Sequence, residues 1–270
     1  MGPNSLKNKI SWASFKNINV YIDQKVILSN INIKLNHGDN TVILGPNGSG
    51  KSTFLKLFNR SIYPINSRNS SLKLFNKENI NIWDLRRKIG FLFKEMEQRV
   101  IKGVRLYDLI ASGFSGTFNS RYSILLSETE KKKIENLIKD WELYNIIDKE
   151  FQSLSDGQKR RALIARALVY EPSILVLDEP FCNLDIKSNF ILNKNLNHLI
   201  NNSLNIVYVT HSLESILTST NRVILIKEGR IINDGKPNEI INSDILSDLF
   251  QISINVIKEG DYWRGFPIDN

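Results

Sequence analysis

Hydrophobic and polar residues alternate at several places in the first part of the chain, which is the pattern of strands with one buried face. The clearest example is the run of Ile31, Ile33 and Leu35, whose members are separated by single polar residues. Similar stretches precede it at Ile10–Ile22 and Lys25–Ile27. We therefore predict that the chain begins with β-strands.

A second pattern follows, in which a short apolar run leads through a glycine-rich loop into a helical segment. Thr41–Leu44 is the apolar run, and Ser52–Asn59 has helical character. Strand-like runs return over residues 72–93 and end in Ile89–Phe93. We predict a strand–loop–helix unit followed by further β-structure.

The remaining chain alternates between helical and strand-like segments. Residues 104–150 are predicted to be mainly helical, because Ile134, Leu137 and Ile138 recur at three-to-four spacing among charged residues. Alternation around a helical middle predicts an α/β architecture with an inserted helical subdomain. The elements expected after residue 150 are helices at Gln158–Tyr170 and Asn189–Asn201, strands at Ile174–Leu177 and Ile206–Thr210, and a hairpin of Val223–Ile226 with Arg230–Ile232.

Composition narrows the class of protein. The chain has 270 residues, of which 41% are hydrophobic and 24% charged, and this balance is that of an ordinary globular protein rather than a wholly disordered one. Its longest apolar runs fall far short of the roughly 18 residues that a membrane-spanning helix needs. Met1–Ile10 lacks the apolar core of a secretory signal, and the one cysteine, Cys182, cannot form an internal disulfide. We expect a cytosolic chain with no membrane insertion.

The net charge of +8 permits contact with nucleic acid or with an anionic membrane face. The lysines and arginines are nevertheless spread along the chain, and the one tight run is Lys131–Lys133. This distribution favours a solvated surface over a dedicated basic patch.

The glycine-rich loop after Thr41–Leu44 carries the first candidate chemistry, because it fits the phosphate-binding pattern G-x-x-x-x-G-K-[ST]. Its glycines allow backbone N–H groups to converge on phosphate oxygens, and the next helix points its positive end at the same anion. We expect Lys51 to reach the β- and γ-phosphates, Ser52 to ligate Mg²⁺ and Thr53 to support the phosphates. The predicted loop consists of Gly45, Pro46, Asn47, Gly48, Ser49, Gly50, Lys51, Ser52 and Thr53.

Two acids follow the apolar strand Ile174–Leu177. Asp178 would lie at the carboxyl edge of the sheet, where it can hold Mg²⁺ through the water shell of the ion. Glu179 would then be placed to orient or deprotonate the attacking water. Taken alone, two acids after a strand also fit a strand that simply ends in solvent.

A Ser/Gly turn opens the next candidate helix, with the sequence Leu154-Ser155-Asp156-Gly157-Gln158, and it lies 20 residues before Asp178. Such a turn presents N–H groups to an anion. Here the chain resembles the ABC ATPases, the nucleotide-binding subunits of ABC transporters. Their signature is L-S-G-G-Q, and Asp156 replaces its first glycine. An N-capped helix start would explain Ser155 alone.

The resemblance implies roles for three further residues. Asp185, within Asn183-Leu184-Asp185, looks like the D-loop that crosses between subunits. His211 looks like the switch histidine that bonds the γ-phosphate. Tyr21 is the candidate for the aromatic that stacks on adenine, the alternative being a strand aromatic that packs inside the β-subdomain.

One position departs from the family. After Ile89–Phe93 the family usually has glutamine, which ligates Mg²⁺ and begins the loop that senses the membrane partner, whereas this chain has Lys94. An ammonium only donates hydrogen bonds and repels Mg²⁺, so we expect Lys94 to point away from the metal and water or Gln98 to replace it. Residues 86–118 resemble a subgroup related to molybdate and iron-chelate import subunits.

The resemblance also implies an architecture. We expect a P-loop NTPase core with a RecA-like parallel sheet and flanking helices, an N-terminal antiparallel β-subdomain and an inserted α-helical subdomain. One ABC ATPase domain would span residues 1–270. Its expected parts are 6–93 (β-subdomain and P-loop part of the core), 94–168 (helical signature subdomain), 169–235 (rest of the core) and 236–270 (C-terminal tail).

The function implied is an ATPase subunit that binds ATP and Mg²⁺, dimerises on ATP and powers an ABC transporter. Two copies, or a copy and a sister chain, would sandwich two ATPs and engage transmembrane permease subunits at the inner face of the cell membrane. The tail Ile245–Phe266 resembles the ending of import-type subunits. The alternative is a soluble ABC ATPase acting on nucleic acid or a protein complex, and the lack of a coiled-coil arm or basic extension argues against it.

Overall fold

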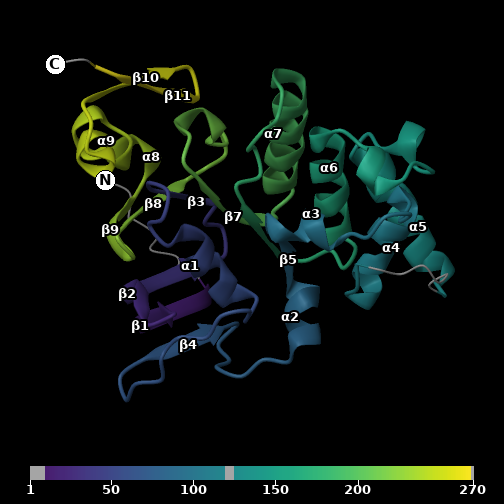
Figure 1. Cartoon of the computed structure of the whole chain (residues 1–270), viewed down its shortest axis with the longest axis horizontal. Coiled ribbons are helices and arrows are strands. Elements are labelled where there is room, and N and C mark those ends of the chain that lie inside the picture. The colour runs from purple at the N-terminus through teal and green to yellow at the C-terminus, as the bar shows by residue number, and fades with distance from the viewer. Residues whose placement is uncertain (1–9, 119–124, 269–270) are drawn as a thin grey trace, which may run out of the picture. The chain divides into compact units, whose positions relative to one another are not determined.

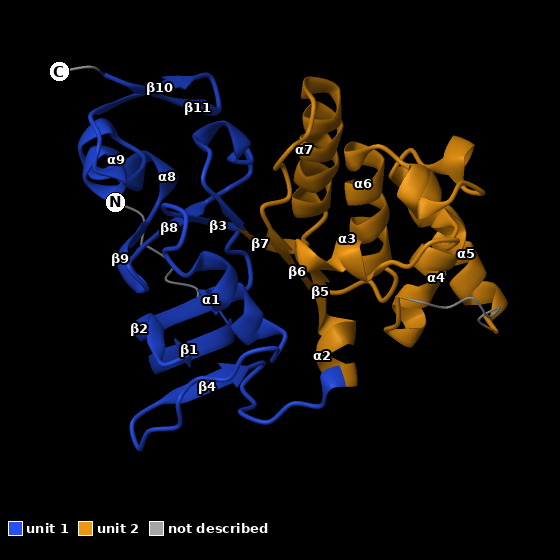
Figure 2. Cartoon of the chain, viewed as in Figure 1, with its two compact units in different colours: residues 1–82, 209–270 blue, residues 83–208 orange. Residues whose placement is uncertain are grey.

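The computed structural model describes residues 10–118 and 125–268, and the chain divides into two compact units (Figures 1 and 2). Unit 1 comprises residues 1–82 and 209–270, and unit 2 comprises residues 83–208. Each unit combines β-strands with helices, so the predicted α/β class is confirmed.

An antiparallel three-stranded sheet forms the N-terminal part of unit 1. Its order is β2-β1-β4, with β1 at Ser11–Ile22, β2 at Lys25–Asn36 and β4 at Ser71–Leu74. The two residues between β1 and β2 both have positive φ, 48° and 63°, as a tight hairpin turn requires. The sequence predicted two strands in place of β2. The strand instead continues through Asn30, which has φ 52° and lies where the β1–β2 register shifts.

The helix that follows the glycine-rich loop packs against this sheet. This helix, α1, spans Lys51–Phe58. Its Phe54 and Phe58 rings each lie 5.1 Å from the ring of Phe15 on β1. The aromatic cluster therefore fixes the helix, and with it the loop that precedes the helix, on the β-subdomain.

The second sheet segment of unit 1 has the order β3-β8-β9. Strand β3 (Thr41–Leu44) is parallel to β8 (Arg222–Lys227), which is antiparallel to β9 (Arg230–Gly235). All four residues of β3 are buried. The tail continues with α8 (Pro237–Ile240), α9 (Ser243–Phe250) and a hairpin of β10 (Ile254–Glu259) with β11 (Tyr262–Pro267).

Unit 2 has the strand order β5-β6-β7, with the bounds Ile89–Leu92, Ile174–Asp178 and Asn205–Thr210. The last two residues of β7 belong to unit 1. Between β5 and β6 the chain forms the predicted helical insertion (Figure 2). The helices of this unit are α2 (Ile82–Lys88, whose first residue belongs to unit 1), α3 (Glu95–Arg99), α4 (Leu106–Ser115), α5 (Glu128–Asp140), α6 (Asp156–Ala167) and α7 (Ile186–Asn201).

The strand-like runs predicted over residues 72–93 are confirmed at the two ends, by β4 and β5, but the part between them contains the helix α2. Ile80 and Ile82 alternate with asparagines and imitate a strand, yet Ile82 is 40% exposed and Leu85 is the buried residue of the helix. Asp84 lies in the first turn, and Arg86 and Lys88 lie in the last turn, where their charges complement the helix dipole.

Candidate nucleotide site

The loop between β3 and α1 is packed so closely that two of its glycines leave no space for a side chain. A Cβ on Gly45 would stand 2.9 Å from Ser49 Oγ and would also collide with the backbone oxygen of Ile226 on β8. Gly50 has φ 98°, and a Cβ there would lie 2.9 Å from the oxygen of Ile27 on β2. The backbone of the loop is therefore wedged against two strands of unit 1, and its shape is fixed before any ligand binds.

The turn between β8 and β9 holds the same loop from its other side. Gly229 N–H donates to the oxygen of Ser49 (3.0 Å), and the oxygen of Gly229 accepts from Ser29 N–H (2.8 Å). Gly229 has φ 72°, and a Cβ at this position would collide with Ile27 O. One turn thus connects the loop to β2 and to the β8–β9 hairpin.

Lys51 lies inside the loop and is 6% exposed. Its ammonium donates to the backbone oxygens of Gly45 (2.7 Å) and Pro46 (2.9 Å). Ser49 Oγ is buried and has no hydrogen-bond partner among the residues that the structure describes. A buried ammonium and an unsatisfied hydroxyl on a glycine cradle suit a ligand rich in negatively charged oxygens.

Helix α1 begins at this cradle without a side-chain cap. Its N-cap is Gly50, whereas α5 and α6 both begin with a serine capping box. The positive end of the helix dipole is therefore directed at the loop. Ser52 and Thr53 lie half-buried on the first turn, which is where the sequence places the Mg²⁺ ligand and a phosphate contact.

The two acids after β6 are both buried, with 2% exposure for Asp178 and 5% for Glu179. Glu179 has φ 50°, a backbone conformation that costs a non-glycine residue on the order of 1–3 kcal/mol and recurs at active sites. Since Leu92 of β5 pairs with Leu177 of β6, Lys94 and Glu179 each lie two residues beyond the same rung of the sheet. The interpretation of these acids as a strand end in solvent is therefore wrong.

Lys94 is exposed and precedes the short helix α3, on which Gln98 is also exposed. Lys159 of α6 forms an ion pair with Glu97 of α3 (3.2 Å). The segment that begins at Lys94 is thus tied to the signature helix within unit 2.

The signature residues form the start of α6, and Ser155 is its N-cap. Ser155 Oγ accepts from Gln158 N–H (3.4 Å), and Gln158 Oε1 accepts from Ser155 N–H (3.0 Å). Asp156 is exposed in the first turn and does not cap the helix. Because the Ser155 hydroxyl accepts in this cap, its own hydrogen stays available for donation to an anion.

Gly157 brings the signature turn against the start of α7. A Cβ on Gly157 would lie 2.6 Å from Ser188 Cβ, and it would collide with the Ser188 hydroxyl. Asp185 caps α7 by accepting from Ser188 N–H (2.6 Å), and this hydrogen bond lowers the pKa of the Asp185 carboxyl. The signature and the candidate D-loop therefore meet at one residue, Ser188.

Arg160 is a residue of this region that the sequence analysis missed. Burial lowers the pKa of its guanidinium, and the nearby acidic groups, among them Glu97, Asp156 and Asp178, oppose that shift. The arginine thus places positive charge close to acids that come from three separate segments of unit 2. The available signal was the pair Arg160 and Arg161, which follows the signature after Lys159, but the proximity to the acids arises only from the tertiary fold.

Tyr21 lies near the tip of the β1–β2 hairpin and is 49% exposed, opposite Val26, which is 53% exposed. The tyrosine does not pack inside the β-subdomain, so its ring could stack on another planar group. His211 is exposed directly after β7, and Ser212 N–H donates to Thr210 Oγ1 (3.2 Å) beside it.

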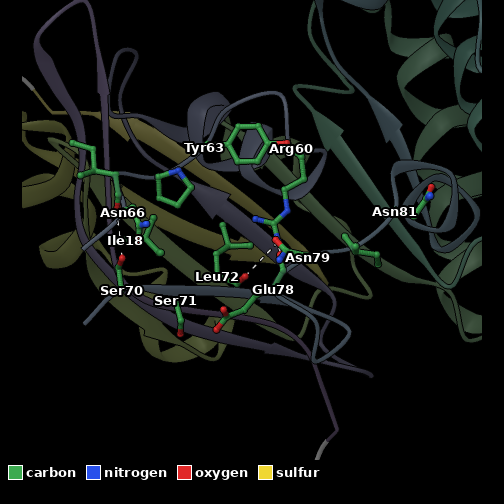
Figure 3. A pocket seen from close by; sticks show the side chains of 13 residues that line it. Ile18, Arg60, Tyr63, Asn66, Ser70, Ser71, Leu72, Glu78, Asn79 and Asn81 are labelled. Atoms are coloured by element: carbon green, nitrogen blue, oxygen red, sulfur yellow. Dashed lines mark hydrogen bonds between the residues drawn. The ribbon is translucent and has the colours of Figure 1, made fainter. Parts of the chain in front are cut away.

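Unit 1 also contains a cavity of about 600 Å³ (Figure 3), which is separate from the loop and includes none of the residues 45–53. One nitrogen of Arg60, Nη2, donates to the backbone oxygens of Leu72 (3.3 Å) and Glu78 (2.8 Å) at one side of it. Burial lowers the pKa of this guanidinium. Arg60 thus holds the segment after β4 against this strand through its hydrogen bonds. None of the residues predicted to bind the nucleotide lines the cavity.

No helix in residues 10–118 and 125–268 combines the length and apolar character of a membrane span. Over the same ranges, no three His, Cys, Asp or Glu side chains are grouped as a metal site would need.

Comparison with known proteins identifies relatives along most of the chain. The sequence model described as "ABC transporter" matches residues 28–182. The chain is 32% identical to the ABC transporter ATP-binding protein YlmA of Bacillus subtilis over 94% of this chain and 97% of the relative. It is also 32% identical to the energy-coupling factor transporter ATP-binding protein EcfA1 of Mycoplasma pneumoniae, over 87% and 83% of the two chains.

Solved structures show the same fold. The cbiO1 protein of Clostridium perfringens, described as part of the ABC transporter complex cbiONQ, has a TM-score of 0.73 and 28% identity, covering 89% of this chain and 94% of that one. A dimeric, post-hydrolysis state of the ATP-binding cassette MJ0796 with ADP and Pi has a TM-score of 0.69 and 26% identity, covering 83% and 98%.

Proposed function

The chain belongs to the ABC transporter family of ATP-binding proteins, and we propose that it is the ATPase subunit of an importer. As a member of this family it is an ATPase that binds ATP and energises transport. The observation that carries the proposal is the loop after β3, in which Gly45 and Gly50 leave no space for a side chain and the buried ammonium of Lys51 lies 2.7 Å from Gly45 O.

Phosphate binding is the role of the β3–α1 loop. Lys51 exchanges a carbonyl partner for oxygens of the β- and γ-phosphates, and the backbone N–H groups of residues 47–53 surround the same oxygens. Gly45 and Gly50 let the phosphates approach the backbone. Tyr21, exposed at its hairpin, stacks on adenine. A base–aromatic stack is worth roughly 1–3 kcal/mol.

Hydrolysis is the role of the buried acids. The Ser52 hydroxyl would ligate Mg²⁺, and the Asp178 carboxylate would hold the ion through its water shell, so that the bound ion would neutralise charge on the phosphates. Glu179 orients the attacking water and takes its proton, and His211 donates a hydrogen bond to the γ-phosphate. Lys94 takes no part in metal binding.

Assembly completes the site. In a homodimer, or a pair with a sister chain, the cradle of one copy faces the signature of the other. Ser155 then donates its hydroxyl hydrogen to the γ-phosphate across the interface, with Gly157 and Gln158 shaping the turn, while Asp185 lies where the copies meet. Loss of the γ-phosphate on hydrolysis removes the bridging ligand, so the pair opens.

Transport defines the partners and the location. We assign the domain boundaries given above, 94–168 for the helical subdomain among them, and a position at the inner face of the membrane against transmembrane permease subunits. Support comes from the relatives, since EcfA1 carries a transporter name and cbiO1 is part of a transporter complex. The alternative of a nucleic-acid ATPase receives no support from these relatives.

Co-purification from detergent-solubilised membranes tests the importer role. A tagged chain with Glu179→Gln, incubated with ATP, should retain a polytopic membrane protein identified by mass spectrometry. The matched control is the tagged chain with Lys51→Ala, which should retain less of it. Recovery of ribosomal or DNA material in place of a membrane protein would contradict the proposal.

A further inference from the structure

The C-terminal hairpin β10–β11 packs on the segment that directly follows His211. We propose that this hairpin is a positioning element of the ATPase site, which sets the place of His211 by holding Leu213. The inference rests on the role that the proposed function gives to His211. All residues involved lie in unit 1.

The contact between the hairpin and this segment depends on a glycine in β11, Gly265. Leu213, two residues after His211, is 9% exposed. Gly265 of β11 lies over it, and a Cβ on Gly265 would be 2.9 Å from Leu213 Cδ1. Trp263, on the same face of β11 as Gly265, is 8% exposed. The glycine therefore allows a close approach of β11 to the leucine, and any larger residue must displace one of the two.

The hairpin is itself fixed to the rest of unit 1. Ser247 Oγ on α9 accepts from Ile254 N–H of β10 (2.9 Å), and Ser243 Oγ on α9 accepts from Val256 N–H (3.0 Å). Lys227, the last residue of β8, donates through Nζ to the oxygen of Asp248 on α9 (2.7 Å). Helix α9 and the hairpin thus form one block that is anchored to the end of β8.

The same end of β8 supports the phosphate cradle. Two residues after Lys227, Gly229 N–H donates to Ser49 O in the loop (3.0 Å). The C-terminal block is therefore attached close to the cradle through Lys227 and close to His211 through Leu213. Because the C-terminal block is attached near the loop and near His211, it can fix the position of His211 relative to phosphates bound in the loop.

Free space lies beside the contact at Leu213. A cavity of about 390 Å³ opens there and is lined by His211, Leu213, Phe250, Ile254 and Gly265 among others. Because this cavity can take up a displaced side chain, a larger residue at position 265 should shift the Leu213 segment without unfolding the unit.

The test is Gly265→Val in the full chain. Valine suits a strand, and Gly265 has no positive φ that would exclude it. We expect kcat for ATP to fall about tenfold or more, since small misplacements of catalytic groups have effects of that size, while the Kd for ATP measured by calorimetry stays within about twofold. The double variant Gly265→Val/Leu213→Ala, which restores space, should recover most of kcat.

The matched control is Arg264→Val, which makes a β-branched residue on the opposite face of the same strand. Arg264 is exposed and forms an ion pair with Glu259 at 3.6 Å, so its replacement should leave kcat unchanged. A Gly265→Val variant with wild-type kcat, or with a weakened Kd for ATP, would overturn the positioning role. A His211→Ala variant with wild-type kcat would instead overturn the role of His211, and the inference with it.

Discussion

At the scale of single residues, we expect nucleotide binding to depend most on the side chain of Lys51. Its ammonium is buried in the loop and held by Gly45 O and Pro46 O. Lys51→Ala removes that cation, so we predict that ATP affinity falls by about tenfold or more, equivalent to about 1.4 kcal/mol. Calorimetric titration with ATP measures the change. Lys56→Ala, on the last turn of the same helix, is the control and should bind ATP as the wild type does.

Lys94, like Asp156, is a residue at which the chain departs from the pattern of its family. It is exposed at the end of β5, at the level of Glu179 in the sheet. Lys94→Gln restores a neutral oxygen ligand, and we predict a higher basal ATPase rate with half-maximal activity at lower Mg²⁺. A titration of rate against Mg²⁺ for both proteins measures this. If Lys94 bonded the γ-phosphate, the glutamine variant would be slower and would bind ATP more weakly, and that result would contradict the prediction.

Residue-level chemistry could be predicted where it is carried by adjacent positions. The loop of residues 45–53 could be placed between a strand and a helix because its spacing alone defines the phosphate pattern, and its contact with phosphate stays a prediction. The contact of Gly157 with Ser188 and the charge of Arg160 beside Asp178 could not be predicted. Both depend on segments that are distant in the sequence and pack together in the fold. No local pattern of residues shows which distant segments will be in contact.

At the scale of elements, the start of α6 decides the effect of Asp156. The residue is exposed in the first turn, one residue after the Ser155 cap, where a negative charge stabilises the helix by about 0.3–1 kcal/mol. We predict that Asp156→Gly lowers the free energy of unfolding by about 1 kcal/mol and leaves ATP-driven dimerisation unchanged. Urea unfolding and sedimentation with ATP, in a Glu179→Gln background, measure the two quantities.

Helix α5 offers the control for that substitution. Glu128 also follows a serine cap with a capping box, and it lies in the first turn of α5. Glu128→Gly should destabilise the chain by a similar amount. A clear gain in dimer for Asp156→Gly alone would show that the carboxylate opposes closure.

Elements were predicted best where every residue of the element is buried, or where burial imposes a clear period. Strands β3 and β6 are fully buried and came from continuous apolar runs. Helix α2 was missed because a single residue, Leu85, is buried, so its seven residues carry no period that separates a helix from a strand. Strand β2 was divided in the prediction because Asn30, with its positive φ, breaks the alternation without ending the strand.

At the scale of the whole molecule, the order of motifs along the chain allowed the family and the α/β fold to be predicted. The chain contains, in this order, the glycine-rich loop, the signature, the strand with two acids and the histidine. The comparisons confirm the family that this order implied. The role of the tail could not be predicted, because Gly265 and Leu213 are ordinary residues until the fold brings them together.

Among these substitutions, Glu179→Gln is expected to have the largest effect on ATP turnover and on dimerisation. Glu179 is 5% exposed and follows Asp178 at the end of β6 in a left-handed conformation. Glutamine has nearly the same side-chain shape as glutamate and must adopt the same positive φ at position 179, but its amide cannot take a proton from water. A general base contributes about 10²–10⁴ in rate, so Glu179→Gln should lose turnover by about that factor. It should also keep ATP binding and accumulate a long-lived ATP-bound dimer.

Sedimentation velocity with ATP and Mg²⁺, alongside phosphate release, measures both effects on the same sample. The matched control is Glu171→Gln, which neutralises an exposed glutamate paired with Lys133 shortly before β6, and it should hydrolyse ATP normally and remain in the wild-type association state. Dimer accumulation follows because the γ-phosphate that bridges two copies is no longer removed. A Glu179→Gln chain that hydrolyses ATP at the wild-type rate would exclude Glu179 as the base. One that loses turnover yet stays monomeric with ATP bound would keep the base and refute the two-copy site.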